Sequence, residues 1–93
     1  MKIELQKFGQ VLTSRPGGKE AFAAIRPTLD AKATDVQIDF AGVISLSPSW
    51  ADEFFRGLEE LYGKPATYLP SSNPSVIATL DILHTQDIRD KSN

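Results

Sequence analysis

The 93-residue sequence contains no cysteine, only one histidine and no long apolar run. Without cysteine, neither a disulfide nor a thiolate metal ligand can form, which suits the cytosol. One histidine and dispersed carboxylates predict neither a transition-metal cluster nor a calcium loop. The apolar runs are a handful of residues long, whereas a membrane-spanning helix needs about 20. We therefore expect a cytoplasmic protein with no metal, no cofactor and no membrane contact.

Positive charge is also sparse. Ten Lys and Arg residues are set against 12 Asp and Glu residues, which gives a net charge of −2. The basic residues are scattered along the chain, without the aromatic interleaving of proteins that bind single strands. The sequence therefore predicts no nucleic-acid partner, and its mildly acidic surface suits a protein partner.

The sequence does contain strand and helix patterns that alternate within one expected domain, residues 1–93. Val36, Ile38 and Phe40 alternate with polar residues and form the clearest strand. Shorter strand patterns lie at residues 2–8, 10–14 and 66–69. We expect the second of these to continue the first or to pair with it as an antiparallel edge.

Apolar side chains recur at helical spacing in three segments. The first follows a glycine turn, and Pro27 should kink it or end it near Arg26. The second should stop at Gly63, and the third spans residues 71–88. The faces expected to be buried are Phe22, Ile25 and Leu29 in the first segment; Trp50, Ala51, Phe54, Phe55, Leu58, Leu61 and Tyr62 in the second; and Val76, Ile77, Leu80, Leu83 and Ile88 in the third.

This order of elements predicts an α/β fold. Strands that alternate with helices are joined by right-handed crossovers, which favour a mixed, mostly parallel sheet. We expect a two-layer sandwich of one four-stranded sheet with the helices on one face. Lys2, Glu4 and Lys7 place charge on the edge of the N-terminal strand pair, so we expect a monomer or a weak dimer.

Two kinds of enzyme site are missing from the sequence. A serine hydrolase would combine His84 with a serine of residues 45–49, yet no Gly-x-Ser-x-Gly elbow surrounds these serines. His84 lies at the edge of an apolar stripe, so we expect a partly buried structural histidine. A phosphate-binding loop would need glycine in place of Thr13 and a hydroxyl in place of Glu20. We therefore expect no enzymatic activity.

The sequence SPSWAD contains a helix start that can be built in two ways. In one, Ser49 is the N-cap and Asp52 takes the capping-box position usually held by Glu or Gln. In the other, Ser47 is the N-cap and Pro48 occupies the first helical position, which proline favours. In both, the unpaired N–H groups of a helix N-terminus tolerate a phosphate, which would lie close to Asp52 and Glu53.

The stretch VQIDFAGVISLSPSWADEFFRGL resembles the core of a STAS domain, the fold of sulfate transporters and anti-sigma factor antagonists. In those proteins a strand ending in Asp-Leu-x-Gly-Val leads through an Asp-Ser-Ser-Gly loop into a helix. Asp39, Gly42 and Val43 match the strand end. Ser49 then falls on the second serine, which is the phosphoacceptor of the antagonists.

Over nearly its full length the chain is more closely similar to the STAS-like family of unknown function. The similarity rests on the stretches FGQVLTSRPGG, IDFAGVISLSPSWADEFF and NPSVIATL. The chain departs from the antagonists in the loop before the helix. Ser47 replaces the aspartate and Pro48 the first serine, while Trp50 and Asp52 stand where antagonists carry glycines.

The resemblance implies a STAS-like sandwich and a non-enzymatic regulatory module, similar to anti-sigma factor antagonists. Such a module would bind a histidine-kinase-like ATPase through residues 44–53. The candidate residues for partner binding or phosphorylation are Arg15, Asp39, Ser47, Ser49, Trp50, Asp52 and Glu53. The alternative is a small-ligand or nucleotide site in the strand-end crevice near Asp39 and Arg15, because ligands gather at the carboxyl ends of strands.

Overall fold

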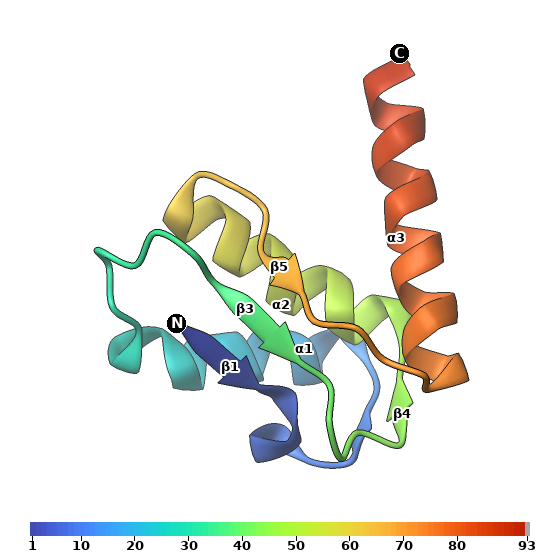
Figure 1. The fold of residues 1–93 in the computed structure, drawn as a ribbon, viewed down its shortest axis with the longest axis horizontal. Coiled ribbons are helices and arrows are strands. Elements are labelled where there is room, and N and C mark those ends of the chain that lie inside the picture. Colours follow the sequence, from blue (N-terminus) through green and yellow to red (C-terminus); the bar gives the residue numbers. More distant parts are fainter. Residues whose placement is uncertain (93) are drawn as a thin grey trace.

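The computed structural model describes residues 1–92, and the side chains of residues 1–85. Figure 1 shows short strands alternating with helices, which confirms the α/β class. Two 3-10 helices, η1 (Leu5–Phe8) and η2 (Arg26–Thr28), lie in the connections. The strands are β1 (Lys2–Glu4), β2 (Val11–Leu12), β3 (Gln37–Asp39), β4 (Ser45–Leu46) and β5 (Thr67–Tyr68), and the α-helices are α1 (Arg15–Ile25), α2 (Pro48–Tyr62) and α3 (Pro74–Ser92).

The strands form two sheets, so the expectation of one mixed four-stranded sheet is wrong. One sheet has the order β1-β3-β5, while β2 pairs with β4 in the other. Every strand pair in the described chain is parallel, and Ile3, for example, lies opposite Ile38. The expected antiparallel N-terminal pair does not form, because η1 and Gly9, with a φ of 127°, turn the chain away from β1.

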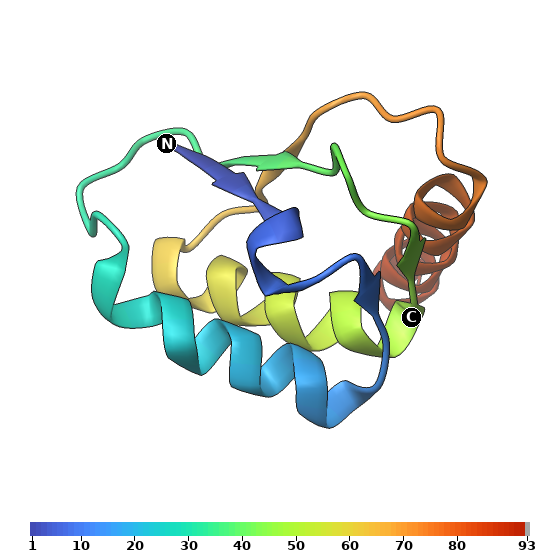
Figure 2. The same ribbon diagram turned by 90° about the horizontal axis from the view of Figure 1, so that it is seen from below.

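Helices α1 and α2 lie side by side on one face of the three-stranded sheet, which gives the expected two layers (Figure 2). The buried core lies between these layers and extends to α3. Leu61 was expected in this core but is 37% exposed, because it lies in the last turn of α2, at the surface. The core residues are Ile3, Leu5, Leu12, Ala21, Val36, Ile38, Phe40, Val43, Leu46, Trp50, Ala51, Phe54, Phe55, Leu58 and Val76.

Helix α1 begins before its two glycines, where a glycine turn was expected. The Oγ of Ser14 accepts a hydrogen bond from the Gly17 N–H at 3.1 Å, so Ser14 is the N-cap and both glycines are helical. Gly18 leaves no room for a side chain, because it lies against the backbone of Trp50 in α2. The helix ends before Pro27 and continues as η2, which confirms the expected break.

Helix α3 extends away from the two layers (Figure 1) and packs on the rest of the fold through its first turns. Val76 and Thr79 are buried there. Two expectations are wrong, because Ile77 is 48% exposed and His84 is exposed rather than partly buried. Ile88, the last residue of the expected stripe, lies outside the described side chains. Among the described residues, no helix combines the length and the apolar character that crossing a membrane requires.

Candidate functional site

Helix α2 begins with Ser47 as its N-cap. The Ser47 Oγ accepts a hydrogen bond from the Trp50 N–H at 3.2 Å, and Pro48 takes the first helical position. Proline favours this position because its φ is already helical and its missing N–H would be unpaired there. Of the two expected helix starts, the one capped by Ser47 is confirmed, and the capping box of Ser49 and Asp52 is wrong.

This arrangement leaves the hydroxyl of Ser49 unused. Ser49 is half-buried in the first turn of α2. Ser47 provides the cap, and the Ser49 side chain makes no hydrogen bond among the described residues. A hydroxyl in this position can accept a modification without the loss of a bond that holds the helix.

Two acidic side chains on the next turn of α2 are paired with arginine. Nη1 of Arg15, at the start of α1, lies 2.8 Å from Oδ2 of Asp52 and 2.9 Å from Oε1 of Glu53. These hydrogen bonds, to Asp52 first and then Glu53, raise the pKa of Arg15. Arg56 lies 3.0 Å from Asp52, which is four residues earlier on the same helix. The cluster therefore holds two positive and two negative charges, and Arg15 joins the starts of α1 and α2.

Trp50 is part of the core and not of the exposed surface. It is 3% exposed and stacks on Phe54 with ring centroids 4.9 Å apart and an interplanar angle of 17°. Phe8 covers it from η1 at 6.1 Å. Trp50 thus fixes the start of α2 against the fold.

Hydrogen bonds join β4 to the start of α3, and the sequence pattern did not predict them. The Leu46 N–H donates to the Ser75 Oγ at 2.9 Å, and the Leu46 carbonyl accepts from the Thr79 Oγ1 at 2.6 Å. Asn73 Nδ2 donates to the Val43 carbonyl at 2.7 Å. These side chains occupy the outer edge of β4 in place of a strand. The sequence signal was a serine and a threonine four residues apart on the apolar face of a helix.

Asp39 and Arg15, the two residues of the alternative ligand site, have separate partners. The Asp39 carboxylate accepts the Ala41 N–H at 3.0 Å and pairs with Lys2 at 3.3 Å. The hydrogen bond to Ala41, followed by the effect of Lys2, holds the pKa of Asp39 below its ordinary value. Asp39 thus orders the turn after β3, while Arg15 is engaged with Asp52. No observation favours a shared ligand crevice for these two side chains.

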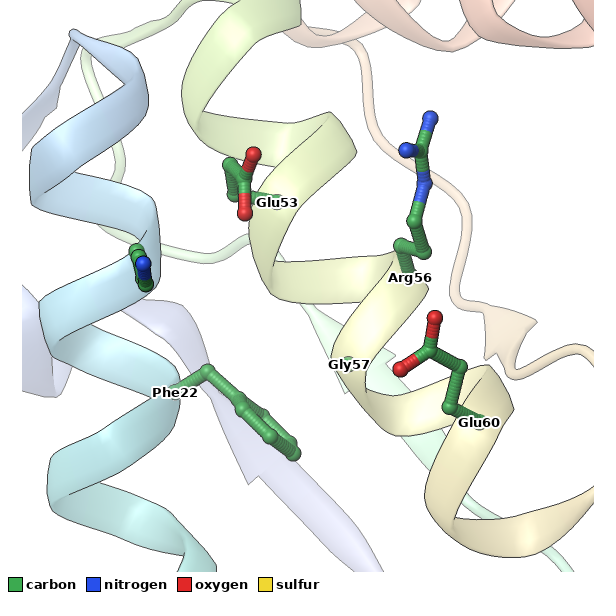
Figure 3. A pocket seen from close by; sticks show the side chains of 6 residues that line it. Phe22, Glu53, Arg56, Gly57 and Glu60 are labelled. Carbon is green, nitrogen blue, oxygen red and sulfur yellow. The ribbon is translucent and has the colours of Figure 1, made fainter.

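An open cavity of about 210 Å³ lies between α1 and α2 (Figure 3). Phe22 of α1 points towards Gly57 of α2, where a Cβ would lie 2.7 Å from the phenyl ring. The charged residues that line the cavity are of both signs: Lys19, Glu53, Arg56 and Glu60. Because positive and negative side chains both line the cavity, its charge favours neither an anionic nor a cationic ligand.

A known protein family matches the part of the chain that contains most of these elements. A family model described as a STAS-like domain of unknown function (DUF4325) matches residues 17–69. The matched segment runs from α1 to the end of β5 and so includes the whole of α2 with Ser49 and its acidic neighbours. No curated protein and no solved structure gives a significant match.

Proposed function

The chain belongs to the STAS-like domain family of unknown function, and we propose that it is a non-enzymatic regulatory module of the cytoplasm. In this proposal, residues 44–53 bind a protein partner through β4 and the first turns of α2. The partner class is a histidine-kinase-like ATPase, which the similarity to anti-sigma factor antagonists implies. Binding is regulated by charge at Ser49.

The unused hydroxyl of Ser49 is the observation that carries this proposal. Ser47 makes the capping hydrogen bond, so a group attached to Ser49 leaves the cap in place. The N-terminus of α2 carries partial positive charge from its unpaired N–H groups, which stabilises an anion there. The site can therefore exist in an unmodified and a phosphorylated form of the same fold.

The charge balance around Ser49 gives the modification an effect on binding. Asp52 and Glu53 follow one turn later, and Arg15 and Arg56 neutralise them. A phosphate adds a charge of about −1.5 to −2 at neutral pH. It converts a nearly neutral cluster into a strongly negative one, which weakens binding to a partner surface that complements the unmodified form.

The test begins with capture of a partner by the tagged protein from cells that contain it naturally. The captured ATPase is then titrated against Ser49→Asp by isothermal titration calorimetry. We expect Ser49→Asp to bind about five- to tenfold more weakly than the wild type, because like charges face each other in the complex. Ser49→Asn is the matched control, since it has the size of aspartate without the charge. Equal affinity of the aspartate and asparagine variants would refute the charge switch.

A further inference from the structure

The small sheet has one open edge, which belongs to β2. The Gln10 carbonyl accepts the Ser45 N–H at 3.1 Å and the Leu12 carbonyl accepts the Ser47 N–H at 2.9 Å, so both face β4. Successive residues of a strand direct their backbone groups to opposite sides. The backbone groups of Val11 and Thr13 therefore point away from β4, where this two-stranded sheet offers no further strand.

The opposite edge of the same sheet is closed. Along β4, the side chains of Ser75 and Thr79 bond the Leu46 backbone, and Asn73 bonds the carbonyls of Val43 and Ile44. Figure 2 shows β4 on one side of β2 and no strand on the other. Because unpaired strand edges recruit extended chains, the β2 edge is where a further strand can add.

A cavity lies along this open edge. Its volume is about 390 Å³, within the usual range of ligand sites of about 300–1,000 Å³. It is bordered by Phe8 of η1, by residues 11–13 of β2, by Gly17, Glu20 and Ala21 of α1, and by Trp50 of α2. Val11 is 61% exposed at this edge. The cavity thus combines outward-facing backbone groups with an aromatic border of Phe8 and Trp50.

The charge at the cavity indicates the kind of chain that fits. Among the described residues that line it, Glu20 alone is charged, and its side chain is exposed. Glu20 forms none of the ion pairs found among the described residues. An incoming segment with a lysine or arginine near an apolar side chain complements this lining better than an acidic one.

We propose that the open edge of β2 binds an extended, cationic peptide segment of a partner protein by strand addition. The segment pairs its backbone with Val11 and Thr13, places an apolar side chain against Trp50 and directs a positive charge to Glu20. This surface is distinct from the free hydroxyl of Ser49. The inference therefore goes beyond the proposed regulatory function and does not depend on it.

The test is an NMR titration of the ¹⁵N-labelled full chain with a terminally blocked hexapeptide of alternating valine and lysine. We expect the amide resonances of Val11 and Thr13 to shift on binding. Val11→Pro should weaken binding about tenfold, because proline removes the outward N–H while the ladder to β4 uses Leu12. Val11→Thr is the matched control, since threonine is also β-branched and keeps the N–H. Folding of both variants is checked by circular dichroism.

The charge part is tested with Glu20→Gln, which keeps the shape of the side chain. We expect this variant to bind the lysine peptide about two- to fivefold more weakly, as for an exposed ion pair. A peptide of alternating valine and glutamate should bind the wild type more weakly than the lysine peptide binds Glu20→Gln. The proposal is overturned if the lysine peptide causes no shift at Val11 and Thr13 up to millimolar concentration, or if Val11→Pro binds like Val11→Thr. If Val11→Pro does not fold, equal binding of the lysine peptide by Glu20→Gln and the wild type overturns it.

Discussion

Gly18 of α1 lies directly against the backbone of Trp50 in α2, where a Cβ at position 18 would be 2.9 Å from the Trp50 carbonyl carbon. Gly18→Ala must therefore push the two helices apart, because a backbone cannot move aside as a side chain can. We expect the free energy of unfolding to fall by about 1–3 kcal/mol, the usual cost of overpacking. Urea unfolding followed by circular dichroism measures this change.

Gly17→Ala is the control for Gly18→Ala. A Cβ at position 17 would lie 3.0 Å from the Ser14 Oγ and 3.3 Å from Trp50 Cδ1, both of which are side-chain atoms. Alanine also favours the helix over glycine by about 1 kcal/mol. We expect Gly17→Ala to stay within about 1 kcal/mol of the wild type. A Gly18→Ala protein as stable as Gly17→Ala would contradict the close approach of the helices.

Phe54→Ala should destabilise the core strongly. Phe54 is 0% exposed and contacts the rings of Phe8, Phe22 and Trp50. Removal of a buried phenyl ring costs about 3–5 kcal/mol, which is enough to unfold many small domains. Leu61→Ala, at a position that is 37% exposed, should cost much less. Thermal unfolding of the two variants at equal concentration compares them, and similar midpoints would refute the assignment of the buried face.

The two serines at the start of α2 should differ in their effect on stability. Ser47→Ala removes the cap to Trp50 and should lower the free energy of unfolding by about 1 kcal/mol. Ser49→Ala removes no hydrogen bond among the described residues and should change it by less than about 0.5 kcal/mol. Chemical denaturation of both variants measures this difference in stability. A larger loss in Ser49→Ala would show that Ser49 is the cap.

Acid should weaken the fold partly through Asp39. Its hydrogen bond from Ala41 and its pair with Lys2 hold its pKa below the ordinary value of 3.8. A carboxyl group with a lower pKa in the folded chain stabilises the fold above its unfolded pKa. This stabilisation is lost as the pH falls through the folded pKa. Asp39→Asn should therefore flatten the loss of stability below about pH 4, as measured by urea unfolding across the acid range. An unchanged acid dependence would contradict this role.

The protein should be a monomer or a weak dimer at micromolar concentration. β1 is an outer strand of its sheet, and Lys2 and Glu4 on it are exposed. Charges on an edge strand oppose pairing between copies. Light scattering coupled to gel filtration gives the mass in solution, and a tight dimer under these conditions would refute the prediction.

The helices and the central strand follow from local patterns in the sequence. The apolar face that contains Phe54 predicts α2, and Gly63 ends it with a φ of 72°, which glycine adopts without strain. Pro27 similarly predicts the end of α1. These features depend on neighbours three or four residues apart, which is why the sequence alone reveals them.

The second sheet and the choice of cap depend on distant residues and could not be predicted in this way. β4 has only two residues, and its outer edge is satisfied by Ser75 and Thr79 of α3. Ser47 and Ser49 both have the chemistry of a cap, and the path of the chain after β4 decides between them. The glycines of α1 predicted a turn, whereas their role is the close contact of Gly18 with Trp50.

The parallel strand pairs determine when the sheets can assemble during synthesis. Lys2 pairs with Gln37, Val11 with Ser45, and Gln37 with Thr67, so none of the strand pairs in the described part of the chain is a hairpin. Long loops must close before any of these contacts forms, and such closure slows folding. On the ribosome, β1 has no strand partner until β3 has emerged, and the larger sheet is complete only after β5. The sheets are thus completed late in synthesis, because each strand pairs with a segment that is made about 30 residues earlier or later.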